Sequence, residues 1–375
     1  MMATAANSTR INTLAALALL VGVVSAGVSA QNQAPARTPS ARLIPAPQLE
    51  LPGRIDSNTP ALWSLVDGAW RMSVMTSWGG VASLAVGSHL EALSPADPVQ
   101  VLDHPGHGLW MESIVEDDGG VWYGYYHHEV PADACGRPER QIPSIGALRS
   151  DDRGRTWADL GIVLEAPADS YACTSTNRFV LGGVGDVSAV LDHERRDLYL
   201  FYSQYSRDTP TQGVAVARLA WADRDEPSGK AAVWNEGAWI PGSPLVSAVE
   251  GAPPAWSFRL GTPLVPASRS WHDGGSTADA YWGPSIHWNT YLERWVMLVN
   301  RARNEQFDQD GLYVAYSATL ADPHSWSPPT KVLQRGGWYP QVIGIEPNEG
   351  TDKTAGRRAR FFVTGRSNHF IEFTR

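Results

Sequence analysis

The stretch DVSAVLDHERRDLYLFY, residues 186–202, decides how this chain folds. It contains a short strand that starts at Asp186, a charged turn, and a second strand of aromatic and aliphatic residues, Leu198 to Tyr202. The same two-strand unit occurs four more times, starting at Asp56, Glu112, Gly283 and Pro340 and leading into apolar runs near Ala69, Val121, Trp295 and Arg360. The sequence therefore predicts five copies of one unit.

The spacing of the five units predicts their architecture. Their starts are separated by 56, 74, 97 and 57 residues, and a constant core with variable insertions is typical of propeller blades. After the first 30 residues we find no apolar stripe of helical period. We expect an all-β fold, a single-domain five-bladed β-propeller; a β-sandwich is the alternative. The strand-like residues 370–374 should close the ring by pairing with a strand from the other end of the mature chain.

Composition narrows the class of partner. The 375 residues include 35 Gly, 27 Pro and 16 Trp, which favours many turns and short strands. The net charge of −9 argues against nucleic acid or an anionic membrane as the main partner, because little basic surface is left to neutralise phosphate.

The N-terminus has the pattern of an export signal. Arg10 precedes the uncharged stretch 11–27, and Val28-Ser29-Ala30 is a small-x-small cleavage site. We predict a signal peptide over residues 1–30 that is cleaved after Ala30, with an uncleaved anchor as the alternative. The mature protein should then be secreted or periplasmic, without membrane contact, and a monomer. Residues 31–52 are rich in Pro and Ala and read as a linker, and residues 53–375 form the propeller domain.

The chain has two cysteines, Cys135 and Cys173. Both follow the signal, and an oxidising compartment favours a disulfide between them. A nucleophilic thiol is the alternative.

The sequence SDDRGRTW, residues 150–157, matches the Asp box pattern S-x-D-x-G-x-T-W. It resembles the hairpin turns of sialidases and other propeller proteins that act on glycans. We expect Asp152 to cap turn amides, Gly154 to supply a positive φ and Trp157 to pack behind the turn, which is a structural role. A sialidase would also open with Arg-Ile-Pro, and Arg54-Ile55-Asp56 departs from that pattern.

Acidic residues begin three of the five units: Asp56, Glu112 and Asp186. The innermost strand of a blade runs beside the central channel, so these side chains should point into one funnel. The run GDVS followed by LYLFYS resembles the five-bladed propeller glycoside hydrolases, which include arabinanases, β-xylosidases, invertases and levansucrases. That resemblance implies catalysis by three acids, although several of those families place the glutamate third.

Glycoside cleavage needs one protonated and one ionised carboxyl group. Trp110 and Met111 flank Glu112 and should raise its pKa by desolvation, so we assign Glu112 as general acid, Asp56 as base or nucleophile and Asp186 as the orienting residue. Turn capping or a structural cation is the alternative use of these acids.

Further residues near the unit starts could hold sugar. We expect Trp110, Trp282 and Trp338 to stack on sugar rings, and Asn58, His107 and His287 to form hydrogen bonds with hydroxyl groups. No zinc-ligand spacing is present, so we expect no cofactor and no metal. A Ca²⁺ bound in the channel is the alternative.

The sequence thus predicts a secreted glycoside hydrolase whose partner is a poly- or oligosaccharide. A glycan-binding propeller without activity is the main alternative. A sialidase-like, lyase or phosphorylase activity on the same fold is a further one, and Arg207, Arg301 and Arg366 would serve a phosphorylase.

Overall fold

The computed structural model describes residues 38–104, 106, 108–245, 255–274 and 277–375. The predicted signal peptide and the first residues of the predicted linker lie outside this range. Among the described residues, no helix is long and apolar enough to cross a lipid bilayer.

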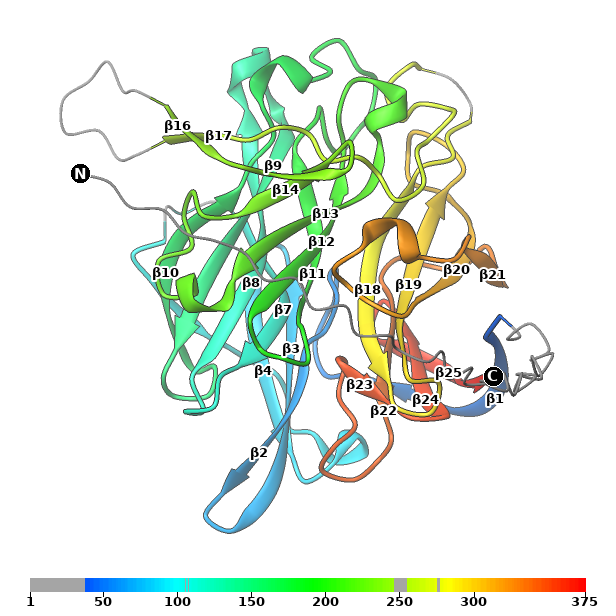
Figure 1. The fold of residues 1–375 in the computed structure, drawn as a ribbon. Helices are drawn as coiled ribbons and strands as arrows, with labels where there is room; N and C mark the ends of the chain where they lie inside the picture. Colours follow the sequence, from blue (N-terminus) through cyan, green and yellow to red (C-terminus); the bar gives the residue numbers. More distant parts are fainter. Residues whose placement is uncertain (1–37, 105, 107, 246–254, 275–276) are drawn as a thin grey trace, which may run out of the picture. The chain divides into compact units, whose positions relative to one another are not determined.

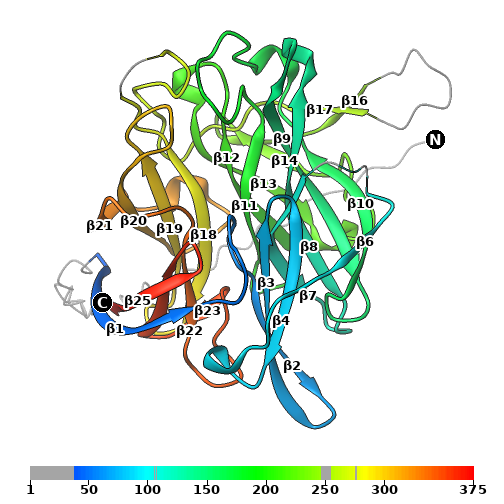
Figure 2. The same ribbon diagram turned by 180° about the vertical axis from the view of Figure 1, so that it is seen from behind.

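Five sheets of four or five strands follow one another along the chain (Figures 1 and 2). Blade 1 consists of β2 (Ala61–Val66), β3 (Ala69–Trp78), β4 (Val81–Gly87) and β5 (Asp97–Pro98). Blade 2 consists of β6 (Gln100–Leu102), β7 (Gly108–Glu116), β8 (Trp122–Ala132), β9 (Arg137–Ser150) and β10 (Thr156–Leu164). Blade 3 consists of β11 (Val184–Leu191), β12 (Asp197–Gln204), β13 (Gly213–Ala220), β14 (Ala232–Asn235) and β15 (Ala238–Pro241).

Blade 4 consists of β18 (Tyr281–Asn289), β19 (Arg294–Ala302), β20 (Gln309–Ser317), β21 (Thr330–Gln334) and the short β23 (Thr354–Ala355). Blade 5 consists of β22 (Pro340–Gly344), β24 (Arg358–Val363), β25 (Arg366–Thr374) and β1 (Ser40–Glu50). A small separate hairpin is formed by β16 (Ser243–Leu245) and β17 (Ala255–Ser257). In the part of the chain that the structure describes, the helical turns are all 3₁₀: η1 (Leu90–Ala92), η2 (Asp133–Cys135), η3 (Ala168–Ser170), η4 (Thr209–Thr211), η5 (Trp221–Asp223) and η6 (Pro323–Ser325).

The five predicted units supply the inner strands. Strands β2, β7, β11, β18 and β22 begin the five sheets, and β7 lies against β11, β11 against β18, and β18 against β22. The predicted five-bladed, all-β propeller is therefore confirmed.

The ring closes in blade 5. Strand β1 pairs antiparallel with β25, from Ser40 opposite Thr374 to Glu50 opposite Arg366, as the closure prediction required. This corrects the predicted linker, because residues 40–50 form a strand. Pro45 and Pro47 concealed it: an outermost strand tolerates proline, since its outer N–H groups need no partner.

Apolar side chains fill the spaces between neighbouring blades. One cluster joins blades 2 and 3 through residues such as Tyr125 and Leu200, and corresponding clusters join the other neighbours, including blades 5 and 1 through Phe362 and Val74. Packing around the whole ring holds the inner strands side by side.

The predicted disulfide is confirmed. Cys135 and Cys173 form a disulfide that ties η2, after β8, to the segment before β11. In the turn at residues 150–157, the backbone N–H groups of Arg155 and Thr156 donate to Asp152 Oδ1 (3.0 and 2.9 Å), and Trp157 is buried behind it.

Candidate active site

β-Bulges place the predicted acids. The ladder between β7 and β8 skips Glu112, and the ladder between β11 and β12 skips Asp186 together with its neighbour. The ladder between β18 and β19 skips Gly283 at the corresponding place. Asp186 and Gly283 both have positive φ, 43° and 60°. A β-bulge redirects a side chain out of the regular alternation of a strand. The three bulges lie at corresponding positions of β7, β11 and β18, so the side chains at these positions do not follow the alternation of their strands.

Asp186 lies at the centre of the site. Its backbone N–H donates to His127 Nδ1 (3.0 Å), which is also 3.5 Å from the Asp186 carboxylate. The hydroxyl of Tyr205 donates to Asp186 Oδ2 and that of Tyr339 to Oδ1 (3.4 Å). Burial and the charge of Asp186 raise the pKa of both phenols, so both remain protonated donors. Groups from blades 2, 3 and 5 thus fix this carboxylate.

Glu112 lies beside Asp186 and is 1% exposed. The backbone N–H and the side-chain amide of Asn58 both donate to Glu112 Oε2 (3.4 and 3.2 Å), and the same amide donates to the Pro284 carbonyl (3.1 Å). Burial, followed by the charge of Asp186, raises the pKa of Glu112 well above its ordinary value. Glu112 therefore favours the protonated form, as predicted, but it lies beneath the surface.

Two carboxyl groups of the site are partly open to solvent. Asp56, just before β2, is half-buried, and the Glu129 side chain on β8 is 31% exposed. Burial and the charge of Asp186 raise the pKa of both, while His127 partly offsets this. We call Asp56, Glu112, His127, Glu129 and Asp186 the acid cluster.

His127 links the exposed and buried acids. Its Nε2 lies 3.7 Å from Glu129 Oε1, and its Nδ1 faces Asp186. Burial opposes protonation of the ring, but the hydrogen bond to Asp186 and the charges of Asp186, Glu129 and Asp56 outweigh it and raise the pKa of His127.

The predicted substrate contacts divide into two groups. Trp110 is half-buried with its edge toward His127 (ring centroids 5.9 Å apart), and Trp338 is half-buried with its Nε1 donating to the Phe307 carbonyl (3.0 Å). Asn58 is buried and holds Glu112, as described above. His107 lies outside the described residues.

Trp282 and His287 are buried, which argues against the predicted contacts with sugar. Trp282 is 2% exposed and packs against Phe307 and Tyr339. His287 is fully buried near Phe373, and burial lowers its pKa to about 3. Both side chains therefore belong to the packing of the fold.

Sequence reasoning missed Glu129, Tyr205 and Tyr339 as members of the site. The run His127-His128-Glu129 places an acidic residue beside two histidines, but by itself it does not indicate a role for Glu129. The hairpin register could have found Glu129, because it lies opposite Gly108 at the start of β7, whereas nothing local marks the two tyrosines.

Part of the cluster could also bind a cation. Glu112, His127 and Asp186 each offer one ligand atom, and these atoms lie within 4.8 Å of one another. An imidazole with two carboxylates suits Zn²⁺ better than Ca²⁺, which takes six to eight oxygen ligands. The donor set therefore gives the Ca²⁺ alternative little support.

No protein-family model and no curated protein matches this sequence. Among solved structures, the chain is similar to an endo-arabinase from Bacteroides thetaiotaomicron (12% identity, 88% of this chain and 95% of that one, TM-score 0.49). It is also similar to an exo-β-1,3-galactanase from Phanerochaete chrysosporium (10%, 87% and 64%, TM-score 0.45), of which it covers less than two thirds. A third similar structure is the catalytic domain of an α-L-arabinofuranosidase from Coprinopsis cinerea (9%, 89% and 98%, TM-score 0.45). At such identities and TM-scores, these similarities leave the activity of the chain open.

Proposed function

We propose that this protein is a glycoside hydrolase that cleaves a neutral poly- or oligosaccharide at the acid cluster. The observation that carries this is the gathering of four carboxyl groups around His127, three of them (Asp56, Glu112 and Glu129) with raised pKa. Crowded carboxyl groups divide into protonated and ionised members, and hydrolysis of a glycosidic bond needs one of each. The same negative charge would repel a uronate, so the substrate is neutral.

Exposure assigns the roles. A general acid must reach the glycosidic oxygen, and of the two glutamates only Glu129 is partly open to solvent. We therefore assign Glu129 as general acid, in place of the buried Glu112, and keep Asp56 as base or nucleophile. Asp186 positions His127 and raises the pKa of both exposed acids, which is the orienting role inferred from the sequence.

Trp110 and Trp338 remain our candidates for stacking on the sugar. Both are half-buried, so part of each indole can meet an apolar sugar face. The Cys135–Cys173 disulfide supports the proposal that the enzyme works in an oxidising compartment outside the cytoplasm.

The decisive test is a screen of the purified protein on neutral polysaccharides, including arabinan, galactan, arabinoxylan and levan, with release of reducing ends as the readout. We expect turnover of at least one substrate, and its loss in Glu129→Gln. Binding without turnover on any substrate would instead support a glycan-binding propeller. Full activity in EDTA would argue against a catalytic cation at Glu112, His127 and Asp186.

The arginines that a phosphorylase or sialidase would need are engaged elsewhere. Arg207 pairs with Asp208 (3.3 Å), Arg301 with Asp310 (3.6 Å) and Arg366 with Glu50 (3.5 Å). Arg54 stacks on the Trp78 ring at 3.8 Å. A lyase would need positive charge to neutralise a uronate, and the acid cluster supplies the opposite sign.

A further inference from the structure

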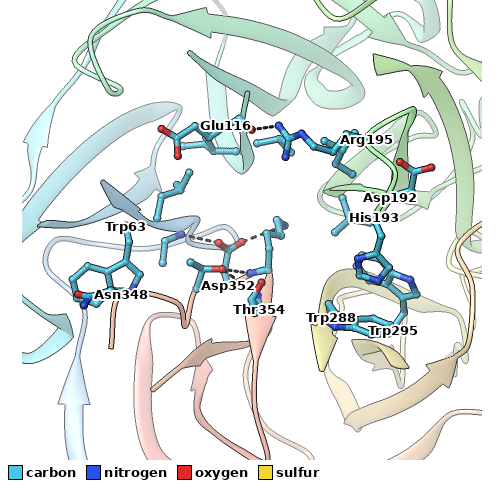
Figure 3. Close-up of a pocket in the computed structure, with 18 of the residues that line it drawn as sticks. Trp63, Glu116, Asp192, His193, Arg195, Trp288, Trp295, Asn348, Asp352 and Thr354 are labelled. Carbon is cyan, nitrogen blue, oxygen red and sulfur yellow. Dashed lines mark hydrogen bonds and ion pairs between the residues drawn. The ribbon is translucent and has the colours of Figure 1, made fainter. Parts of the chain in front are cut away.

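A cavity of about 550 Å³ lies where the inner strands β7 and β11 end and where β2 begins, with Ala61–Trp63 in its wall. Its walls include Ile114–Glu116 at the end of β7, Val190 and Leu191 at the end of β11, and Trp288 near the end of β18. The loop before β23 contributes Thr351–Lys353. Figure 3 shows the labelled side chains of the wall, among them Glu116, Trp288 and Asp352. We call this cavity the strand-end cavity.

The strand-end cavity is separate from the acid cluster. The wall residues nearest to the acids along these strands are Ile114, two residues after Glu112, and Val190, four residues after Asp186. A strand rises about 3.3 Å per residue, so these separations are about 7 and 13 Å. Lys353 reaches inward from the cavity wall and its ammonium donates to Ser188 Oγ (3.3 Å), two residues beyond Asp186. A ligand in the cavity would therefore not touch the acids of the proposed active site.

Aromatic rings form much of the cavity wall. His193 stacks on Trp295 (centroids 5.0 Å apart, planes 24° apart) and meets Trp288 edge-on at 4.3 Å. On the other side, Trp63 is fixed because its Nε1 donates to the Gly350 carbonyl (2.9 Å), and Trp70 at the rim is 44% exposed. Figure 3 places Trp63 and the His193 group across the cavity from each other. Preformed rings of this kind offer flat apolar faces to a ligand.

The two basic side chains of the cavity wall, Lys353 and Arg195, are each paired with a carboxylate. Asp352 accepts from the Ala61 backbone N–H (2.9 Å) and pairs with Lys353 (3.2 Å). Arg195 pairs with Asp118 (3.1 Å) and donates to the Glu116 carbonyl (2.8 Å). The polar side chains that remain include Asn348, Thr351 and Thr354, which donate and accept, and the carboxyl groups of Glu116 and Asp192, which have no ion pair among the described residues. This favours a ligand whose groups both donate and accept, as hydroxyl groups do, over a phosphate or a uronate.

We propose that the strand-end cavity is a second carbohydrate-binding site, which holds a short neutral oligosaccharide without cleaving it. The alternation of rings and hydrogen-bonding groups suits a sugar, which presents C–H faces and hydroxyl edges. The volume lies within the range of about 300–1,000 Å³ that ligand pockets have. The site would hold a polysaccharide on one side of the propeller while the acid cluster works on the other.

The test uses two exposed tryptophans on one strand. Trp70 lies near the start of β3 and lines the cavity, whereas Trp78 ends the same strand, is 42% exposed and does not line it. Calorimetric titration of the full protein with xylotriose, arabinotriose, cellotriose, mannotriose and a charged control, trigalacturonate, should show binding of a neutral trisaccharide. Trp70→Ala and His193→Ala should each weaken it about tenfold, and Trp78→Ala should leave it unchanged.

Two results would overturn the second site: no heat with any neutral trisaccharide, or equal effects of Trp70→Ala and Trp78→Ala. Loss of the same binding in Asp56→Asn would also overturn it, because the sugar would then sit at the acid cluster. This readout needs no turnover. Trisaccharide binding that depends on Trp70 in a protein without hydrolase activity would therefore support the second site while contradicting the proposed function.

Discussion

The two ends of the inner strands use the same scaffold for different chemistry. At the beginning of the strands, bulges at Glu112 and Asp186 gather carboxyl groups around one imidazole, and the pKa values of the exposed acids are raised. At the other end, where the ladders run regularly, the charges of Asp352 and Arg195 are paired and aromatic rings form the wall. The crowded carboxyl groups of the acid cluster suit proton transfer. The ion pairs and aromatic rings of the strand-end cavity suit the binding of a neutral ligand.

The change with the largest expected effect disrupts the whole propeller, and with it both the acid cluster and the strand-end cavity. Deleting residues 368–375 takes most of β25 and leaves β1 and β24 without their shared partner. An unpaired edge promotes aggregation, so we expect an insoluble product or a large fall in melting temperature, not a selective loss of activity. Soluble yield and calorimetry measure this, with deletion of Arg375 alone as the control. An unchanged melting curve for the longer deletion would mean that β25 is an appendage.

The next largest effect should distinguish the acid cluster from the strand-end cavity. Glu129→Gln keeps the shape of the side chain but removes the proposed general acid, so kcat should fall by about 10²- to 10⁴-fold. The raised pKa of Glu129 should set the alkaline limb of the pH profile, because activity is lost as this acid deprotonates, and that limb should disappear in the variant.

The matched control for this prediction is Glu139→Gln, a glutamate on β9 outside the acid cluster. Trisaccharide binding in the strand-end cavity should be unchanged in both variants. If Glu112→Gln, and not Glu129→Gln, abolished activity, the buried glutamate would be the general acid after all.

This contrast also marks what the sequence could and could not predict. The five units and their starts follow from local pattern, because strand alternation and turn composition are local properties. The disulfide follows from the presence of just two cysteines, both behind a predicted export signal. Glu129 escaped detection because its position depends on the register between β7 and β8, and Tyr205 and Tyr339 because they reach Asp186 across blades. Residues 40–50 were mistaken for a linker since prolines on an edge strand look like those of a tether.

Loss of the disulfide should lower the free energy of unfolding more than it changes hydrolysis or trisaccharide binding. The bond between Cys135 and Cys173 closes a loop of 38 residues, and removing such a bond costs about 2–4 kcal/mol. We expect the Cys135→Ser, Cys173→Ser double variant to unfold at a lower denaturant concentration than the wild type and to keep trisaccharide binding. Thiol titration of the folded wild type should find no free thiol. Two free thiols would contradict the bond.

Glu112→Gln should change how stability depends on pH. The pKa of Glu112 in the folded protein is raised well above 4.5, so the folded state binds this proton more tightly than the unfolded chain does. The wild type therefore loses stability as the pH rises above the pKa that Glu112 has in the unfolded chain. Glutamine mimics the protonated form, so the variant should melt at a higher temperature than the wild type at pH 8, by about 2 °C or more, and at nearly the same temperature at pH 5. A variant that is destabilised equally at both pH values would show that Glu112 is ionised in the folded protein.

The smallest expected effect lies at the turn of residues 150–157, which belongs to neither end of the channel. Burial is the largest single influence on the Asp152 carboxylate and disfavours it, but the hydrogen bonds from Thr156, Ser150 and Arg155 together outweigh burial and lower the pKa of Asp152. Its stabilising contribution is therefore present above the unfolded pKa and is lost as the pH falls through the folded one. Asp152→Asn should cost about 1 kcal/mol at neutral pH, as the loss of a capping carboxylate does, and should leave hydrolysis and trisaccharide binding intact. The neighbouring Asp151 is exposed and pairs with Arg149 (2.9 Å), so Asp151→Asn is the matched control and should change stability by less. A loss of activity in Asp152→Asn without a loss of stability would mean that this turn contributes to the reaction, which its hydrogen bonds do not suggest.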